Sequence, residues 1–195
     1  KLLALLTDPG AGAYRIRNGR FLIFNGGTVS LLMGLTGELA DDDLRIQQLV
    51  SLVLLNLAGI PDCRPRLLKF APDLIQLLRP GFTCTNAARA NIIKALCLLS
   101  EPFVGPEDRQ PKADAAAEAS AWRRSTVACA KVLAGETAVE AYRSLLTDMA
   151  RPPVTGSLEP PSWSEAEVGM VAGLVKLLCQ ITSYRVMPSP ASTLM

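Results

Sequence analysis

The side chains that proteins use most often for catalysis and metal binding are sparse in this 195-residue chain, which contains no histidine. Histidine is the commonest general base and the commonest metal ligand, so a serine or cysteine nucleophile would need a lysine or carboxylate partner here. The sequence contains no G-x-S-x-G, S-x-x-K or paired-acid motif that would supply one. We therefore expect no enzyme activity, no cofactor and no bound metal.

Two short stretches resemble ligand sites at first sight. Asp41-Asp42-Asp43 could hold a metal ion, but three consecutive side chains at a helix start point in different directions, and the EF-hand spacing is absent. Capping of the following helix is the stronger interpretation. Gly26-Gly27 could hold a phosphate, but the sequence lacks G-x-G-x-x-G and a following Lys-Ser/Thr. We interpret the two glycines as a helix stop, because glycine tolerates the left-handed conformation.

The five cysteines show neither a C-x-x-C pair nor metal-ligand spacing. Cys97, Cys129 and Cys179 lie in apolar helical stretches, where a free cysteine behaves as a small hydrophobic residue. An odd number of cysteines without metal spacing favours a reducing compartment. No stretch has the pattern of a signal peptide or a membrane span. We therefore predict a cytoplasmic protein without membrane insertion.

Composition favours helices and argues against nucleic-acid binding. Hydrophobic residues make up 49% of the chain and aromatic residues 5%, and leucine and alanine dominate. These two residues favour helix, whereas strands favour aromatic and β-branched residues. The net charge is +2, and no basic stripe is interleaved with aromatic residues as nucleic-acid binding requires. We predict an all-α fold without any β-sheet.

Two long apolar stretches repeat each other. Residues 44–58 place apolar residues at helical spacing on one face, namely Ile46, Val50, Val53, Leu54 and Leu57. Residues 87–100 repeat this pattern at an offset of 42, which aligns Val50 with Ile92, Leu54 with Leu96 and Leu57 with Leu99. The shorter stretches before them, 26–35 and 70–78, match at an offset of 43, with Leu31 over Leu74. Units of three helices every 42 residues or so predict an α-solenoid.

Start and stop signals give the predicted helix bounds. Gly59 is expected to end a helix, Pro72 to open one, and Ser164-x-x-Glu167 to form a capping box. Ile181 follows Leu99 by 82 residues, or two periods, and continues the repeat. The predicted helices cover 17–24, 28–36, 44–58, 64–70, 72–79, 86–100, 121–134, 136–150 and 164–185.

The stretch "NGRFLIFNGGTVSLLMGL" followed by "RIQQLVSLVLLNLA" resembles the armadillo repeat, with a short helix, a Gly-Gly turn, a second helix and a long third helix ending near "NLA". The resemblance covers 14–100 and parts of 101–185, and HEAT repeats are the nearest alternative. It implies a right-handed α-solenoid of about three armadillo-like three-helix repeats, with the last expanded by insertions. The segments are then the end of a preceding repeat (1–13), two repeats (14–60 and 61–100), an insertion (101–120), an expanded repeat (121–185, with a second insertion at 151–163) and a tail (186–195).

In armadillo proteins the third helices line a concave groove that binds extended peptides or partner helices. On the 44–58 helix, Gln48, Leu52 and Asn56 fall four apart, off the predicted buried face. Equivalent residues complete the predicted partner-binding groove: Gln48, Leu52, Asn56, Asn91, Lys94, Leu98, Lys176 and Gln180. The Trp of the import-receptor branch is missing three times, so we do not expect nuclear-signal binding. An ordinary solvent face, with Asn91 bonded between helices, is the alternative.

Two functions remain open from the sequence. The first is a scaffold or adaptor that binds other proteins reversibly in this groove. The second is a structural subunit packed permanently into a large assembly, such as the cytoskeleton of a cilium or flagellum. In that case the insertions and the tail would carry the contacts with neighbouring subunits.

Overall fold

The computed structural model describes residues 1–25, 27–38, 44–79, 84–101, 127–150 and 163–186, and all regular structure within these ranges is helical. The prediction of an all-α fold is therefore confirmed. The helices are α1 (Leu2–Thr7), η1 (Pro9–Ala11), α2 (Ala13–Phe24), α3 (Thr28–Glu38), α4 (Leu44–Ala58), η2 (Pro61–Cys63), α5 (Arg64–Leu67), η3 (Leu68–Phe70), α6 (Ala71–Gln76), α7 (Asn86–Ser100), one over 127–133, α9 (Glu136–Ala150) and α10 (Glu165–Val186).

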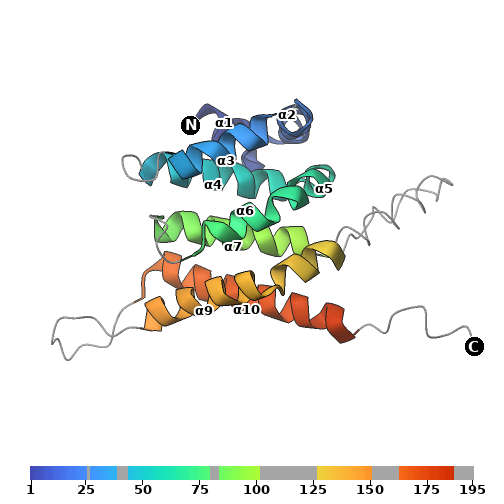
Figure 1. The fold of residues 1–195 in the computed structure, drawn as a ribbon. Helices are drawn as coiled ribbons and strands as arrows, with labels where there is room; N and C mark the ends of the chain where they lie inside the picture. Colours follow the sequence, from blue (N-terminus) through green and yellow to red (C-terminus); the bar gives the residue numbers. More distant parts are fainter. Residues whose placement is uncertain (26, 39–43, 80–83, 102–126, 151–162, 187–195) are drawn as a thin grey trace, which may run out of the picture.

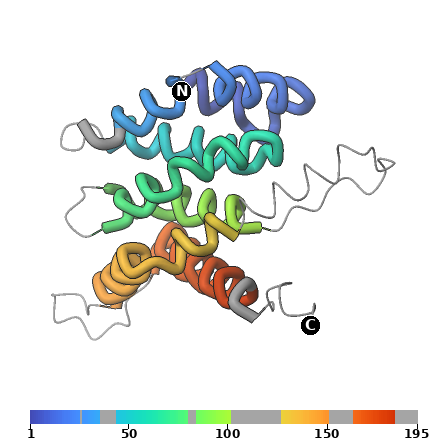
Figure 2. The backbone as a smooth tube through the Cα atoms, turned by 45° about the vertical axis from the view of Figure 1, so that its right-hand side comes forward, coloured from blue at the N-terminus to red at the C-terminus, as the bar shows by residue number. Residues whose placement is uncertain are grey.

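The helices are stacked in layers that follow the chain from its N-terminus to its C-terminus (Figures 1 and 2). One row of the stack consists of α1, α4, α7 and α10, in which each helix packs on the next. The helices α3, α6 and α9 lie along one side of that row, against α4, α7 and α10 respectively. The core fills the space between the two rows, so the opposite side of α4 and α7 is left to face outward.

The predicted core positions of the long helices are confirmed apart from Ile46, which is half-buried at the edge of the core. Leu57, Leu99 and Ile181 are 0%, 0% and 6% exposed. The other aligned pairs, Val50 with Ile92 and Leu54 with Leu96, are buried as well. Because α4 and α7 have equal length and start 42 residues apart, equivalent positions meet equivalent neighbours.

The predicted alignment of the short helices is wrong by one residue. Leu31 is 66% exposed, whereas Leu32 is 4% exposed and Val29 is also buried. Leu32 and Val29 lie 42 residues before the buried Leu74 and Ala71, so the short helices keep the same offset as the long ones. A shift of one residue turns a side chain by about 100° around a helix, which is enough to move Leu31 into solvent.

The turn between α2 and α3 has the predicted glycine conformation. Gly27 has φ 99°, in the left-handed region that disfavours other residues. Gly26 and Asp41-Asp42-Asp43 lie outside the described residues. Gly59 follows α4 as predicted but without positive φ, since among the described glycines only Gly12 and Gly27 have it. A Cβ on Gly59 would displace the end of the Arg15 side chain, whose guanidinium donates to the carbonyl of Asn56.

Most predicted bounds agree with the structure to within a few residues. The 44–58, 86–100 and 136–150 helices are confirmed as α4, α7 and α9, whereas α2 begins four residues earlier than predicted and α6 ends three earlier. Pro72 lies in the first turn of α6. The capping box is formed, since the Ser164 N–H donates to Glu167 at 2.8 Å and the Glu167 N–H to Ser164 Oγ at 3.3 Å. Most of the predicted insertions and tail lies outside the described residues.

Candidate functional site

The candidate site is the side of α4, α7 and α10 that faces away from α3, α6 and α9 (Figure 1). Gln48 on α4, Lys94 on α7 and Lys176 on α10 are exposed, and Leu52 and Leu98 are half-buried beside them. We call these five residues the third-helix surface. It combines an amide, two ammonium groups and partly exposed apolar side chains across three successive layers.

Asn56 does not belong to this surface, and its predicted exposure is wrong. The side chain is 5% exposed and lies between α4 and α1. Its amide nitrogen donates to the carbonyl of Ala4 and to Thr7 Oγ1, both at 3.3 Å. A buried amide needs such partners, so Asn56 ties the first helix to the stack.

Two more amides of the predicted groove, Asn91 and Gln180, also join neighbouring helices. Asn91 is half-buried, and its Nδ2 donates to Ser51 Oγ of α4 at 3.2 Å, which confirms the interpretation of a polar group bonded between helices. Gln180 accepts a hydrogen bond from Ser100 Oγ of α7 at 2.9 Å. Each of these side chains is turned toward the preceding helix of the row, so their first role is to set how the layers stack.

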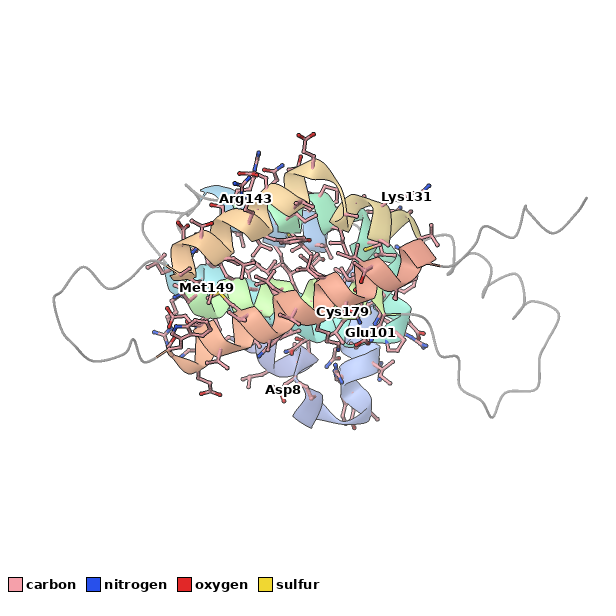
Figure 3. The ribbon with its side chains drawn as sticks, turned by 90° about the horizontal axis from the view of Figure 1, so that it is seen from below. Asp8, Glu101, Lys131, Arg143, Met149 and Cys179 are labelled. Atoms are coloured by element: carbon pink, nitrogen blue, oxygen red, sulfur yellow. The ribbon has the colours of Figure 1, made fainter. Side chains whose placement is uncertain are left out.

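Lys176 is part of a charged cluster at the C-terminal end of α7. Its Nζ lies 2.9 Å from Glu101 Oε1, and Arg64 lies 3.5 Å from the other carboxylate oxygen. Glu101 lies beside α10 (Figure 3), as its contact with Lys176 requires. Arg64 also donates to the last-turn carbonyl of Ala58 at 2.8 Å, which caps α4.

The surroundings of both cations shift their pKa values. The hydrogen bond from Lys176 to Glu101 raises the pKa of the ammonium, whereas burial lowers the pKa of the Arg64 guanidinium despite the nearby carboxylate. Since Glu101 already offsets the charge of Lys176, Lys94 is the better-placed cation for an acidic partner.

One glycine of α10, Gly173, lets that helix approach α7 closely, and the sequence-based prediction did not include it. A Cβ on Gly173 would lie 2.7 Å from Ile93 Cγ2, and the Cys97 thiol donates to the Gly173 carbonyl at 3.2 Å. The Lys94 ammonium lies 3.9 Å from the position of a Cβ on Gly169. The signal that could have revealed this contact is the G-x-x-x-G spacing, which puts both glycines on one helix face.

A shallow hollow of about 200 Å³ lies beside the turn between α2 and α3. Basic side chains from Arg66 and Lys69 line it together with apolar residues. The Arg66 guanidinium lies over the Phe24 ring at 3.9 Å, which occupies one of its faces. The described residues of the lining include no carboxylate and no cysteine, and its hydroxyl and ammonium groups come from Ser30 and Lys69.

The cysteine thiols are poorly suited to nucleophilic chemistry. All five are free, and Cys63, Cys97 and Cys129 are buried. Burial raises their pKa to about 11, about 11 and about 12 respectively, so they remain protonated at neutral pH. Cys179 is exposed, although it lies in an apolar helical stretch. Within the described ranges, no three His, Cys, Asp or Glu side chains converge as a metal site would require.

Comparison with known proteins identifies no relative: no family model, curated protein or solved structure matches the chain. Functional inference therefore rests on the stacking of the helices and on the chemistry of the third-helix surface.

Proposed function

We propose that this chain is a non-catalytic protein–protein interaction module, built as a right-handed armadillo-type α-solenoid of about three repeats. Its third helices, α4, α7 and α10, would bind a partner segment along the third-helix surface. The equal length of α4 and α7, their offset of 42 residues and their direct packing support this interpretation. The predicted reducing, cytoplasmic location is supported by the five free thiols.

The observation that carries the binding proposal is the exposure of Lys94 on α7, with the half-buried Leu98 one turn later and the half-buried Leu52 at the equivalent position of α4. An ammonium group flanked by apolar side chains fits a partner segment that alternates acidic and apolar residues. Apolar contact would supply the driving force, and Lys94 would add attraction that salt screens. Gln48 can bond an extended backbone through both its donor and its acceptor.

The test is selection of random peptides on the immobilised chain, followed by affinity measurement at two salt concentrations. We expect acidic–apolar peptides that bind more weakly at high salt. Lys94→Glu should weaken them on the order of tenfold, as expected for reversal of one charge at a contact. Lys131→Glu is the matched control, because Lys131 is exposed on the 127–133 helix. Equal peptide affinities of the Lys94→Glu and Lys131→Glu variants would show that Lys94 does not contribute to the binding site.

A second candidate function is a structural subunit of a large assembly, including the cytoskeletal assemblies named above. It is favoured by exposed apolar side chains at both ends of the stack, Leu2 and Leu5 on α1 and Val168 and Val175 on α10. Exposed apolar patches of this kind mark surfaces that bind other proteins. The two functions predict different results for a chain that lacks residues 102–126 and 151–162. If this chain still binds the selected peptides, the adaptor is favoured. If it keeps peptide binding but no longer binds neighbouring subunits, the structural subunit is favoured.

A further inference from the structure

The hollow beside the turn between α2 and α3 is formed where two successive layers of the stack meet. One wall comes from the end of α2 and the first turn of α3, and the other comes from α5 and η3 of the next layer (Figure 1). Because both walls belong to helices of this chain, the hollow lies at the junction of two layers and not on an end face of the stack.

Two cations line this hollow without an acidic partner. Arg66 and Lys69 are exposed and three residues apart, so they lie on one face of the α5–η3 segment. Within the described ranges neither of them forms an ion pair, whereas Arg20, Arg64 and Lys176 each contact a carboxylate. Two positive charges are therefore available at one place for an anionic ligand.

Arg66 is held in position by an aromatic ring. Its guanidinium carbon lies 3.9 Å from the centre of the Phe24 ring, which attracts the cation. This contact orients the guanidinium without a carboxylate, so the N–H donors at its edge stay available for an oxyanion. Phe24 is itself 53% exposed, so an apolar group beside the bound anion can contact the same ring.

The rest of the lining also suits an oxyanion. Asn25 contributes an amide and Ser30 a hydroxyl, and both groups can donate hydrogen bonds. Val29 and Ser30 belong to the first turn of α3, where backbone N–H groups have no acceptor within the helix. The volume of about 200 Å³ is smaller than the roughly 300–1,000 Å³ of pockets for drug-sized ligands, so the hollow admits a small group.

A phosphate monoester matches this lining better than a carboxylate does. It carries about −1.5 to −2 charges at neutral pH and three strong acceptor oxygens, so it can bind both cations and a hydroxyl together. A carboxylate carries one charge, which a single arginine can pair through two hydrogen bonds. Because the hollow is shallow, a small free ester would gain few contacts, whereas a phosphorylated side chain of a peptide adds contacts outside the hollow, beginning with Phe24.

We propose that this hollow binds a phosphorylated side chain of a partner protein. Arg66 and Lys69 bind the phosphate oxygens, the Ser30 hydroxyl donates to the same group, and an apolar neighbour of the phosphorylated residue packs on Phe24. The site goes beyond the proposed function and does not depend on it, since it shares no residue with the third-helix surface. The glycine turn alone lacks a phosphate motif, because the cations that complete the site come from the next layer.

Peptide libraries test this proposal on the 195-residue chain. Random peptides with phosphoserine, glutamate or serine at a fixed central position are captured on the immobilised protein and compared. We expect phosphoserine peptides to bind on the order of tenfold more tightly than the other two sets, as expected for additional charge-assisted hydrogen bonds. An Arg66→Gln, Lys69→Gln variant should lose this preference.

The matched control is an Arg143→Gln, Lys131→Gln variant, which removes the same charge from exposed positions outside the hollow and should keep the preference. Circular dichroism and melting temperature check that both double variants stay folded. Equal capture of the three libraries, or equal loss of preference in both double variants, would overturn the proposed site.

Two further measurements identify the ligand and separate the site from the third-helix surface. Phenyl phosphate is added while the backbone amide signals of Ser30 and Lys69 are followed by NMR. Shifts with phenyl phosphate but no preference for phosphoserine peptides would overturn a phosphorylated protein as the ligand. Lys94→Glu should leave the phosphoserine preference unchanged, and its loss in this variant would place the phosphate on α7 and overturn the assignment to the hollow.

Discussion

The close approach of α7 and α10 can be tested by adding one methyl group. In Gly173→Ala the new Cβ would lie 2.7 Å from Ile93 Cγ2, and Ile93 is 0% exposed, so it has little room to move. Overpacking of this kind costs about 1–3 kcal/mol. Replacing glycine by alanine inside a helix also stabilises it by about 1 kcal/mol, which partly hides the clash.

Gly34→Ala provides the reference that separates the two effects. Gly34 lies inside α3, and a Cβ there would meet nothing within 4 Å. In this variant only the higher helix propensity of alanine acts, so its free energy of unfolding should rise by about 1 kcal/mol. We expect the free energy of unfolding of Gly173→Ala to be lower than that of Gly34→Ala by about 1–3 kcal/mol in urea denaturation.

A double-mutant cycle identifies the clashing partner. If Ile93 causes the loss, Gly173→Ala in an Ile93→Ala background should be as favourable as Gly34→Ala, because the methyl group that it would meet has gone. Equal stabilisation by the two single glycine variants would refute the close packing of α7 on α10. A loss that persists without the Ile93 side chain would refute the assignment to Ile93.

Two further predictions concern the core and its thiols. Leu99→Ala should lower the free energy of unfolding by about 2–5 kcal/mol, because Leu99 is fully buried, and a loss below about 1 kcal/mol in urea denaturation would contradict the register of α7. Burial raises the pKa of Cys97 to about 11 and that of Cys129 to about 12, whereas thiols in the unfolded chain ionise near about pH 8.5. Above about pH 8.5 the unfolded state therefore loses protons that the folded state retains. The free energy of unfolding should fall as the pH rises from about 8.5 to about 11. Urea midpoints measured across this range should decline less for a Cys97→Ala, Cys129→Ala variant, and parallel declines would contradict the assignment.

The secondary structure and most of the core could be predicted from the sequence, because they depend on local patterns. Apolar residues at helical spacing define α4 and α7, and the recurrence of that spacing after 42 residues identifies equivalent core positions such as Leu57 and Leu99. Gly27 and the Ser164–Glu167 capping box were also predictable, since both depend on the backbone within a few residues.

The candidate site was predicted only in part, because burial on an outer helix face depends on the neighbouring helix. Residues four apart are displaced by about 40° around a helix, so Gln48, Leu52 and Asn56 span about 80°. Across this arc the side chains pass from exposed to half-buried to buried, because α1 covers the Asn56 end. The spacing of four places the three residues near one another, but it does not reveal where a neighbour begins to cover them.

The sequence by itself determined the helices, their 42-residue repetition and the apolar face that each long helix buries. The tertiary structure decided which of the remaining faces is covered by the next helix, and so which polar residues join layers and which stay accessible. The physical reason is that helix formation depends on contacts three or four residues apart, whereas contacts such as that between Ser100 and Gln180 join residues 80 positions apart. Two such residues meet only when whole helices stack, and no local pattern records that distance.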